Sequence, residues 1–311
     1  MRILITGGAG CLGSNIIEAL LPAGHEILVI DNFATGKREV VPAVDGLQVI
    51  EGSVADTQLV EDAFTNFAPT HVIHSAAAYK DPQNWLEDTD TNVRGTANVV
   101  MSADKHDVKR LVYFQTALCY GRPETVPIPV THPLRPITSY GISKTAGESI
   151  VAMGKTPWIS FRLANVTGPR LAIGPIPTFY KRLKAGQSCF CSDTVRDFVD
   201  MQDFMSLLGI CLDDTATTGV FNVSTGIGHS IREVYEAVAA YLRIDPPHAP
   251  TVPCGDDDVP AVVLDPSLTE KTFGWNADKS FTNLITKMLQ WYDKYGVTDI
   301  YSHLSSPAKI N

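Results

Sequence analysis

Short apolar runs alternate with amphipathic segments over the first half of the chain. Six of these runs have the length of buried strands and are rich in aliphatic residues. They cover residues 1–6, 26–31, 47–54, 70–77, 110–117 and 158–165. Segments with apolar residues at helical spacing, such as 87–104, separate the runs. This alternation predicts an α/β fold with a parallel, doubly wound sheet whose ligands lie beyond the carboxyl ends of the strands.

The pattern changes after residue 165. It predicts a helix around 178–185, a return to the sheet at 220–224, and amphipathic helices at 231–242 and 281–295. No repeat or low-complexity linker separates the two halves, so we expect a Rossmann-type sheet with a smaller mixed α/β lobe toward the C-terminus. The expected lobes are residues 1–165 plus about 196–224, and about 166–195 plus 225–311.

Three glycines follow the first apolar run at intervals of three residues. Gly7, Gly10 and Gly13 lie between that strand and the start of a helix. Glycines in such a turn let a pyrophosphate approach the backbone and lie at the helix N-terminus. Asp31 ends the next strand about 20 residues further on, where it would meet ribose hydroxyls. The complete arrangement predicts a dinucleotide site.

Asp31 also bears on which dinucleotide is bound. Its carboxylate would repel a 2′-phosphate, which favours NAD over NADP. Lys37 and Arg38 lie close enough to accept such a phosphate, so NADP stays open on the residues alone. A purely structural glycine turn is the alternative, and the surrounding strand, helix and acid argue against it.

The overall composition is that of a folded, acidic protein. The 311 residues are 44% hydrophobic and 19% charged, with a formal net charge of −9 at pH 7. This charge argues against nucleic-acid and anionic-membrane partners. No apolar run reaches the ~20 residues of a membrane span, and the first run is too brief for a signal sequence. We expect a cytoplasmic enzyme.

The six cysteines are scattered along the chain without a regular spacing. Cys189 and Cys191 form a C-x-C pair with no second pair nearby, so we expect no metal site. Reduced thiols packed as small apolar groups are the default for such cysteines.

A tyrosine and a lysine four residues apart provide the first candidates for catalysis. Tyr140 and Lys144 lie in a segment with helical character and project from one face of it. An ammonium beside a phenol lowers the phenol's pKa from ~10 toward neutrality, which makes it a usable base. Thr116 adds a hydroxyl at the carboxyl end of the fifth strand. A surface tyrosine beside a lysine is the simpler alternative, but convergence with the dinucleotide site favours catalysis.

Together these motifs resemble a known family. The chain is similar to the extended short-chain dehydrogenase/reductases, in particular the NAD-dependent nucleotide-sugar epimerase/dehydratase group that includes UDP-galactose 4-epimerase. More narrowly, it resembles sugar epimerases of bacterial O-antigen gene clusters, which implies a role in lipopolysaccharide O-antigen biosynthesis. The matching segments, in family order, are Gly7-x-x-Gly10-x-x-Gly13, Asp31-Asn32, His74-Ser75-Ala76-Ala77, Asn92-Val-x-Gly95-Thr, Thr116 before Tyr120-Gly121, Tyr140-x-x-x-Lys144, Asn165, Arg196-Asp197-Phe198, Asn222-Val223, Gly255-Asp256, Asp265-Pro-Ser and Gly274-Trp275.

The resemblance implies an isomerase that keeps NAD bound and holds a nucleoside-diphosphate sugar between its lobes. Tyr140 would take a hydroxyl proton as hydride leaves the same carbon, Thr116 would hydrogen-bond that hydroxyl, and Lys144 would hold the ribose and polarise Tyr140. In the 4-epimerase version the ketosugar turns over and receives the hydride on its other face. The resemblance favours C4 epimerisation of a UDP-sugar and a homodimer formed through helices 87–104 and 138–153.

The resemblance also implies which residues bind the two ligands. The implied cofactor residues are Gly7, Gly10, Cys11, Leu12, Gly13, Asp31, Asn32, Gly36, Ser53, Val54, Ser75, Ala76, Ala77, Asn92, Tyr140 and Lys144. The implied substrate residues are Lys80, Thr116, Asn165, Thr178, Arg196 and Asp256. Arg196 is suited to phosphates because its guanidinium is a planar fork of donors.

Departures from the family pattern leave alternatives open. Thr116 is followed by Ala117-Leu118, whereas the usual 4,6-dehydratase has Asp-Glu there, so ordinary dehydration is disfavoured. Ser53 stands where the family usually has an acid and Pro253 where an Arg is common, so UDP is only a preference. A dehydratase, or a net dehydrogenase or reductase, is the second enzyme hypothesis. A non-enzymatic NAD-binding redox sensor is the third, and the tyrosine–lysine pair argues against it.

Overall fold

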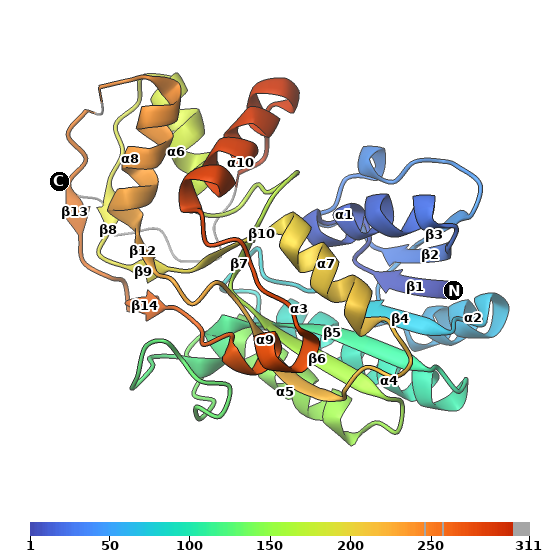
Figure 1. Cartoon of the computed structure of the whole chain (residues 1–311). Coiled ribbons are helices and arrows are strands. Elements are labelled where there is room, and N and C mark those ends of the chain that lie inside the picture. Colours follow the sequence, from blue (N-terminus) through green and yellow to red (C-terminus); the bar gives the residue numbers. More distant parts are fainter. Residues whose placement is uncertain (246, 257, 301–311) are drawn as a thin grey trace. The chain divides into compact units, whose positions relative to one another are not determined.

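Seven strands form the central sheet of the computed structural model, which describes residues 1–245, 247–256 and 258–300. The strand order is β11-β6-β5-β4-β1-β2-β3 (Figure 1). The strands are β1 (Arg2–Thr6), β2 (Glu26–Asp31), β3 (Leu47–Glu51), β4 (His71–His74), β5 (Arg110–Thr116), β6 (Trp158–Leu163) and β11 (Gly219–Val223). The pairs that link β5, β4, β1, β2 and β3 are all parallel. This order is that of a doubly wound dinucleotide-binding sheet, so the predicted Rossmann-type α/β fold is confirmed.

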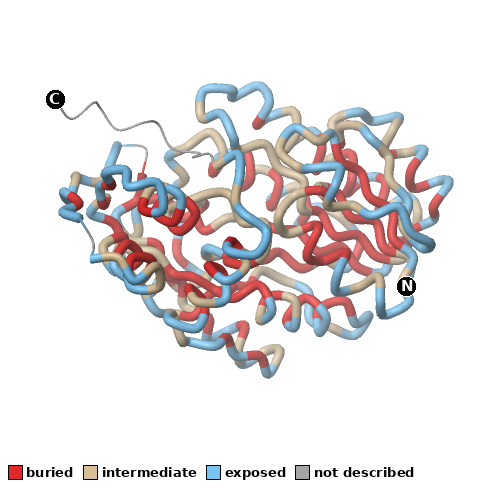
Figure 2. Tube along the Cα trace, turned by 90° about the horizontal axis from the view of Figure 1, so that it is seen from above, coloured by how far each residue is buried: buried red, intermediate tan, exposed pale blue. Residues whose placement is uncertain are grey.

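Helices connect these strands and cover both faces of the sheet. They are α1 (Cys11–Leu20), α2 (Thr57–Phe67), α3 (Trp85–Thr89), α4 (Gly95–Lys105), α5 (Ser139–Met153) and α7 (Met201–Cys211), with 3₁₀ turns η1 (Leu21–Ala23), η2 (Arg38–Val40) and η4 (Ala117–Tyr120). α2, α4 and α5 lie on one face and α1 on the other (Figure 1). Because both faces are covered, the inner strands are mostly apolar and buried, as Figure 2 shows, whereas the edge strand β3 is only partly buried.

Three predicted elements have different bounds in the structure. The helix expected at 87–104 begins at Trp85 and is interrupted by a π turn, η3 (Asp90–Arg94), which directs Asn92 into the core. The fourth strand ends at His74, where Ser75 Oγ donates to the carbonyl of Thr6 at 2.8 Å and turns the chain out of the sheet. The sixth strand ends at Leu163, and the following residues pair separately as β7 (Asn165–Thr167) with β10 (Phe198–Asp200).

The contacts divide the chain into two compact units. Unit 1 comprises Met1–Cys119, Thr138–Arg162 and Met205–Phe221, and unit 2 comprises Tyr120–Ile137, Leu163–Phe204 and Asn222–Asn311. The division thus places residues 120–137 and 196–204 in unit 2, whereas the sequence-based boundaries assigned them to the first lobe. Local pairing explains the difference, because β9 (Val195–Arg196) pairs with strands of unit 2 and Tyr120 Oη donates to Asn222 Oδ1 at 2.6 Å.

Unit 2 is built around three helices that share one apolar core. They are α6 (Pro175–Lys184), α8 (Ile231–Leu242) and α10 (Phe281–Tyr295), and their buried faces meet at residues such as Phe179, Tyr235 and Leu289. The remaining elements are β8 (Cys191–Ser192), β12 (His229–Ser230), β13 (Thr251–Val252), β14 (Ala261–Val262) and α9 (Ser267–Phe273). The predicted helices at 231–242 and 281–295 have the expected bounds, and the expected mixed α/β character is confirmed.

The length and polarity of the helices can be compared with what a membrane span requires. Within the described ranges, no helix is both long and apolar enough to cross a membrane.

Candidate active site

The turn between β1 and α1 leaves no space for side chains at two of its glycines. Gly7 has φ +70°, and a Cβ there would lie 2.7 Å from the backbone nitrogen of Ala76. A Cβ on Gly13 would lie 2.3 Å from the carbonyl oxygen of Gly7. At Gly10 the nearest atom is that same oxygen at 3.3 Å. The turn therefore presents bare backbone beside α1, as a pyrophosphate site requires.

The N-terminus of α1 completes this site. Its N-cap residue is Gly10, which has no side chain to accept from the helix, and the first turn contains no acidic residue. Cys11, Leu12 and Gly13 form that first turn. The amides and the dipole at a helix N-terminus attract phosphate groups. These residues therefore fit the pyrophosphate of NAD.

Asp31 fastens the turn from the end of β2. Its Oδ2 accepts from the amide of Ala9, and its Oδ1 accepts from the amide of Phe33, both at 2.8 Å. The residue is buried, so the carboxylate has a fixed position. Asn32 Oδ1 accepts from the amide of Ala34 at 3.1 Å and shapes the same loop. The acid predicted to meet the ribose thus also supports the backbone beside it.

Arg38, one of the two cations that left NADP open, already has partners. Its guanidinium forms an ion pair with Glu51 and lies 4.2 Å from the centroid of the Phe33 ring. Glu51 is opposite Asp31 in the β2–β3 register, so this edge carries two neighbouring carboxylates. A 2′-phosphate would have to compete with Glu51 for Arg38, which favours NAD.

The remaining cofactor candidates of the sheet follow the carboxyl ends of β3 and β4. They are Ser53, Val54, Ser75, Ala76 and Ala77. The carbonyl of Val54 accepts from Asn98 Nδ2 at 2.9 Å, and the amide of Ala76 donates to Thr6 Oγ1 at 3.2 Å. Gly36 packs against Ala9 of the glycine turn, where a Cβ would come within 2.7 Å of the alanine methyl. The structure therefore gathers these predicted cofactor residues beyond the carboxyl ends of the strands.

Asn92, predicted to contact the cofactor, has a positioning role in the structure. Its side chain is buried and binds both backbone groups of Ala78, at 2.9 Å each. Its Nδ2 also donates to Ser143 Oγ at 3.0 Å, and Ser143 Oγ donates to the carbonyl of Tyr140 at 3.0 Å. Asn92 thereby ties the loop after β4 to the helix that carries Tyr140.

Two side chains of β5 hold α5 in register, which sequence reasoning missed. Tyr113 Oη and Gln115 Nε2 both donate to the carbonyl of Lys144 at 2.9 Å. Gln115 Oε1 accepts from the amide of Thr116 at 2.8 Å. One glutamine therefore contacts both the strand end with Thr116 and the helix with Tyr140 and Lys144. The only sequence signal for this contact was the polar Gln115 in a mostly apolar strand.

Lys144 is buried inside this arrangement. Its Nζ lies 4.0 Å from the centroid of the Tyr113 ring. Burial lowers the pKa of Lys144 from 10.5 to about 7, against the opposing influence of Glu148. Glu148 itself forms a buried ion pair with Arg162 at 2.6 Å. Lys144 can therefore change its charge near neutral pH, which suits a group that acts beside a phenol.

His74 is a packed strand histidine. It is fully buried between the hydroxyls of Thr6, at 2.6 Å from Nδ1, and Thr96, at 2.9 Å from Nε2. Burial, and secondarily the charge of Lys144, lower the pKa of His74 to about 3. The Thr96 hydroxyl donates to the carbonyl of Asn92 at 2.7 Å, so Nε2 carries the imidazole proton. His74 is neutral and structural.

An aromatic residue next to Lys80 contacts the catalytic candidate. The Tyr79 and Tyr140 rings have centroids 5.8 Å apart, tilted by 53°. Lys80 itself is exposed. The sequence analysis singled out Lys80 for the substrate, and its neighbour Tyr79 packs against Tyr140.

Besides Lys80 and Thr116 of unit 1, four predicted substrate residues lie in unit 2. Asn165 Nδ2 donates to the carbonyl of Asp197 at 2.9 Å, and Thr178 Oγ1 donates to the carbonyl of Gly174 at 2.8 Å. Arg196 forms an ion pair with Asp258 at 2.5 Å. The main-chain carbonyl of Asp256 accepts from Arg122 at 3.3 Å. The structure therefore brings Arg196 and the segment around Asp256 together, through a residue that the sequence analysis did not single out.

Metal ligands were not expected. In the part of the chain that the structure describes, no three His, Cys, Asp or Glu residues are grouped so that they could hold a metal ion. Cys189 and Cys191 are buried, and burial raises the pKa of both thiols.

Known proteins share this arrangement. The family model described as NAD dependent epimerase/dehydratase family matches residues 3–224. The crystal structure of the Bordetella bronchiseptica enzyme WbmG in complex with NAD has a TM-score of 0.93 at 68% identity, over 98% of each chain. The chain belongs to the NAD dependent epimerase/dehydratase family. A second WbmG crystal structure, with NAD and UDP, matches with the same score and identity.

Two further relatives of this family member carry the same enzyme name. The UDP-glucose 4-epimerase of Thermus thermophilus, solved in complex with NAD, is 32% identical with a TM-score of 0.86, over 95% of this chain and 100% of that one. The UDP-glucose 4-epimerase of Lactobacillus helveticus is 27% identical over 326 residues, covering 95% of this chain and 98% of the relative. The predicted resemblance, and with it an NAD-dependent enzyme of the epimerase type, is confirmed. The roles of individual residues stay predictions.

Proposed function

We propose that this chain epimerises a UDP-sugar at C4, with NAD as resident cofactor and Tyr140 as the base. The observation that carries the proposal is the register between β5 and α5. Tyr113 and Gln115 bind the Lys144 carbonyl, so Thr116, Tyr140 and Lys144 belong to one fixed assembly. The relatives named UDP-glucose 4-epimerase and the WbmG complex with UDP support the choice of a UDP-sugar.

Each member of this assembly has a distinct task. NAD, when bound, accepts hydride from the sugar carbon and returns it. Tyr140 takes the hydroxyl proton of that carbon and later gives it back. Thr116 Oγ1 accepts from the amide of Leu118 at 3.2 Å, which directs its own hydroxyl proton away from the strand and toward a sugar oxygen. Lys144, in its charged form, stabilises the phenolate of Tyr140.

Epimerisation is favoured over loss of water because of the residues that follow Thr116. Ala117 is buried and Leu118 is apolar, so neither can protonate a leaving hydroxyl. The dehydratase, the net dehydrogenase or reductase, and the NAD-binding redox sensor remain the alternatives that the experiment below must exclude.

Contacts to the nucleotide sugar are proposed for both units. In unit 1 we assign Lys80 and Thr116 to the sugar. In unit 2 we assign Asn165, Thr178, Arg196 and Asp256 to the nucleotide sugar, with Arg196 on the diphosphate. An exposed position agrees with such a role for Lys80, Asn165 and Asp256.

A homodimer through the helices at 87–104 and 138–153 is part of the proposal. The surfaces of α3, α4 and α5 expose Leu86 (80%), Met101 (71%) and Met153 (83%). Exposed large apolar side chains gathered on neighbouring helices are typical of protein interfaces. Light scattering should give twice the chain mass, and a monomer would contradict this part of the proposal. The cytoplasmic location and the O-antigen role stay predictions.

The test uses the protein as purified, without added NAD. Denatured protein should release NAD, and the intact enzyme should interconvert the two C4 epimers of at least one UDP-sugar to the same ratio from either side. A requirement for added NAD would favour a net dehydrogenase. A product that has lost water would favour a dehydratase, and bound NAD without turnover of any nucleotide sugar would favour a sensor.

A further inference from the structure

The arginine proposed to bind the diphosphate already has an anionic partner inside unit 2. Arg196 Nη2 donates to Asp258 Oδ1 at 2.5 Å, and the two side chains are only 13% and 10% exposed. A charge that is removed from water is stable only when it is paired. The two residues therefore act as one electrostatic unit.

The backbone around the pair fixes its geometry. Arg196 Nη1 donates to the carbonyls of Val195 and Val259, both at 2.8 Å. Asp258 Oδ1 also accepts from the amide of Val259 at 2.7 Å. The pair thus joins β9 to the segment that leads into β14, and neither side chain can move without breaking main-chain bonds.

The same segment carries Asp256. The amide of Asp258 donates to the carbonyl of Gly255, the neighbour of Asp256, at 3.2 Å. Arg122 holds the Asp256 carbonyl from the other side. The charge state of Asp258 is therefore coupled to a segment in which the sequence analysis placed a substrate contact.

A diphosphate and a carboxylate compete for one guanidinium. Arginine has five donors, and the contacts above use both Nη1 hydrogens and one on Nη2. A phosphate oxygen that reaches Nη2 comes close to Asp258, and two anions on one partly buried cation repel each other. The diphosphate must therefore either displace the Asp258 carboxylate from Arg196 or bind despite the repulsion between the two anions.

We propose that Asp258 is an internal counter-ion of Arg196 that limits the affinity of this chain for the diphosphate of its nucleotide sugar. The inference rests on the proposed function, because it takes Arg196 as the diphosphate ligand. Its chemical consequence is selective: Asp258 weakens the binding of ligands with a diphosphate and leaves an uncharged nucleoside unaffected. Asp258 also speeds product release, because it recaptures Arg196 when the diphosphate departs.

The experiment measures UDP and uridine binding by calorimetry to the full-length protein with its NAD. Asp258→Asn keeps the shape and removes the charge, so UDP should bind about tenfold more tightly, with uridine unchanged. Glu236→Gln, an exposed acid on α8, is the matched control and should leave both affinities within twofold. Arg196→Met, which removes the proposed diphosphate ligand, should weaken UDP binding and leave uridine binding unchanged.

The outcomes separate the inference from the function beneath it. UDP binding that is unchanged or weaker in Asp258→Asn, while Arg196→Met weakens it, overturns the inference and leaves Arg196 as the diphosphate ligand. Wild-type protein that binds no UDP overturns both. Asp258→Ser, whose hydroxyl can still accept from the Val259 amide, serves if Asp258→Asn does not fold, and the same tenfold gain is expected.

Discussion

The two ends of strands β4 and β5 bury polar side chains in different surroundings. At their amino ends lie His71 and Arg110, the first residues of the two strands. At their carboxyl ends lie His74 and Thr116, and Thr116 belongs to the candidate catalytic assembly. Both ends belong to unit 1 and share the same sheet, so the contrast isolates what surrounds each group.

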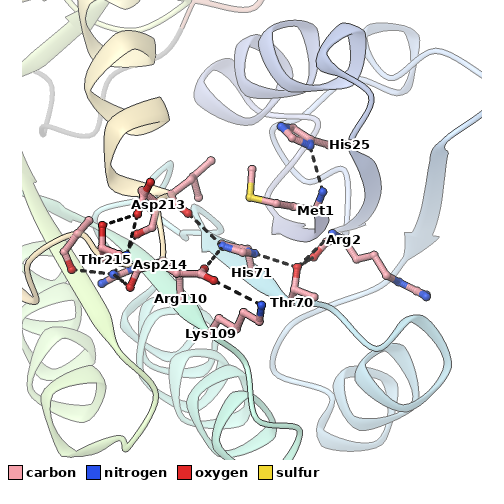
Figure 3. Close-up of polar contacts among 12 residues, drawn as sticks. Met1, Arg2, His25, Thr70, His71, Lys109, Arg110, Asp213, Asp214 and Thr215 are labelled. Atoms are coloured by element: carbon pink, nitrogen blue, oxygen red, sulfur yellow. Dashed lines mark hydrogen bonds and ion pairs between the residues drawn. The ribbon is translucent and has the colours of Figure 1, made fainter.

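At the amino ends, polar partners satisfy part of what is buried (Figure 3), but within the described residues Arg110 Nε and Nη1 are buried without a hydrogen-bond partner. Arg110 Nη2 donates to the carbonyls of Asp213, Asp214 and Ala216 at 3.2, 3.2 and 2.7 Å. His71 Nε2 lies 3.1 Å from Asp214 Oδ1. All these acceptors belong to the loop that follows α7. The network therefore fastens that loop to the sheet and has no group directed at a ligand site.

Near the carboxyl end of β5, the buried charge lies against an aromatic ring. Lys144 Nζ is 4.0 Å from the centroid of the Tyr113 ring, and burial lowers the pKa of Lys144 to about 7, although Glu148 favours the charged form. The glycine turn and the N-terminus of α1 follow the carboxyl end of β1 in the same sheet. The comparison teaches that incomplete compensation of a buried charge does not by itself mark a functional site, which also needs ligand-binding backbone at the same ends of the strands.

The largest expected effect breaks the carboxyl-end assembly. Tyr140→Phe removes the proton acceptor and should lower kcat by about 10³-fold while NAD remains bound. Turnover and released NAD are measured on the same preparation. Tyr295→Phe, at an exposed tyrosine of α10, is the matched control and should keep full activity. Activity in Tyr140→Phe within tenfold of the wild type would refute its role as the base.

The next effect falls on the amino end and should leave catalysis intact. Arg110→Met removes three hydrogen bonds from a buried guanidinium to loop carbonyls, so the free energy of unfolding should drop by about 3 kcal/mol with kcat per folded molecule unchanged. Urea denaturation measures the loss. Lys109→Met, at an exposed neighbour, should change stability by less than about 0.5 kcal/mol. A large fall in kcat for Arg110→Met would show that the two ends are coupled.

A smaller effect tests the register between β5 and α5. Gln115→Met loses the bonds to the Lys144 carbonyl and to the Thr116 amide, so kcat should fall about tenfold with little change in KM. Steady-state kinetics on the UDP-sugar substrate measure both constants. An unchanged kcat would mean that Tyr113 alone sets the register.

The last effect is a pH dependence shared by both ends. Burial lowers the pKa of His71 and of His74, so the unfolded chain takes up more protons than the folded one below about pH 6.5. Stability should therefore fall as the pH drops from 7 to 5, by up to ~1.4 kcal/mol per pH unit for each histidine. Denaturation of His71→Gln should show a shallower fall than the wild type. Equal slopes would contradict the assignment of His71 as buried and neutral.

Features that depend on the spacing of residues along one strand or helix could be predicted from the sequence. The glycine turn, Asp31 and the pair Tyr140 and Lys144 could be found because each function needs fixed intervals along one strand or helix. The alternation of runs likewise predicted the sheet. Strand ends were less predictable, because Ser75 turns the chain through a bond to Thr6, which is distant in sequence.

Contacts between elements could not be predicted in the same way. That Gln115 reaches the Lys144 carbonyl depends on how α5 packs on β5. The ion pair between Arg196 and Asp258 joins residues far apart in sequence and gives an anionic partner to the arginine that is predicted to bind the diphosphate. Arg110 appeared in the sequence only as a charge at the start of a strand, and its carbonyl partners come from a loop about a hundred residues away.

The central claim is that Tyr140 serves a hydride transfer that begins and ends on one sugar carbon. The most direct test incubates the purified enzyme with UDP-, GDP-, CDP- and dTDP-sugars in deuterated water and follows the sugar protons by NMR. The account predicts that a UDP-sugar is inverted at C4 and that no deuterium is incorporated at any carbon. Deuterium at a carbon beside C4, or product formed only when NAD is added, would contradict it.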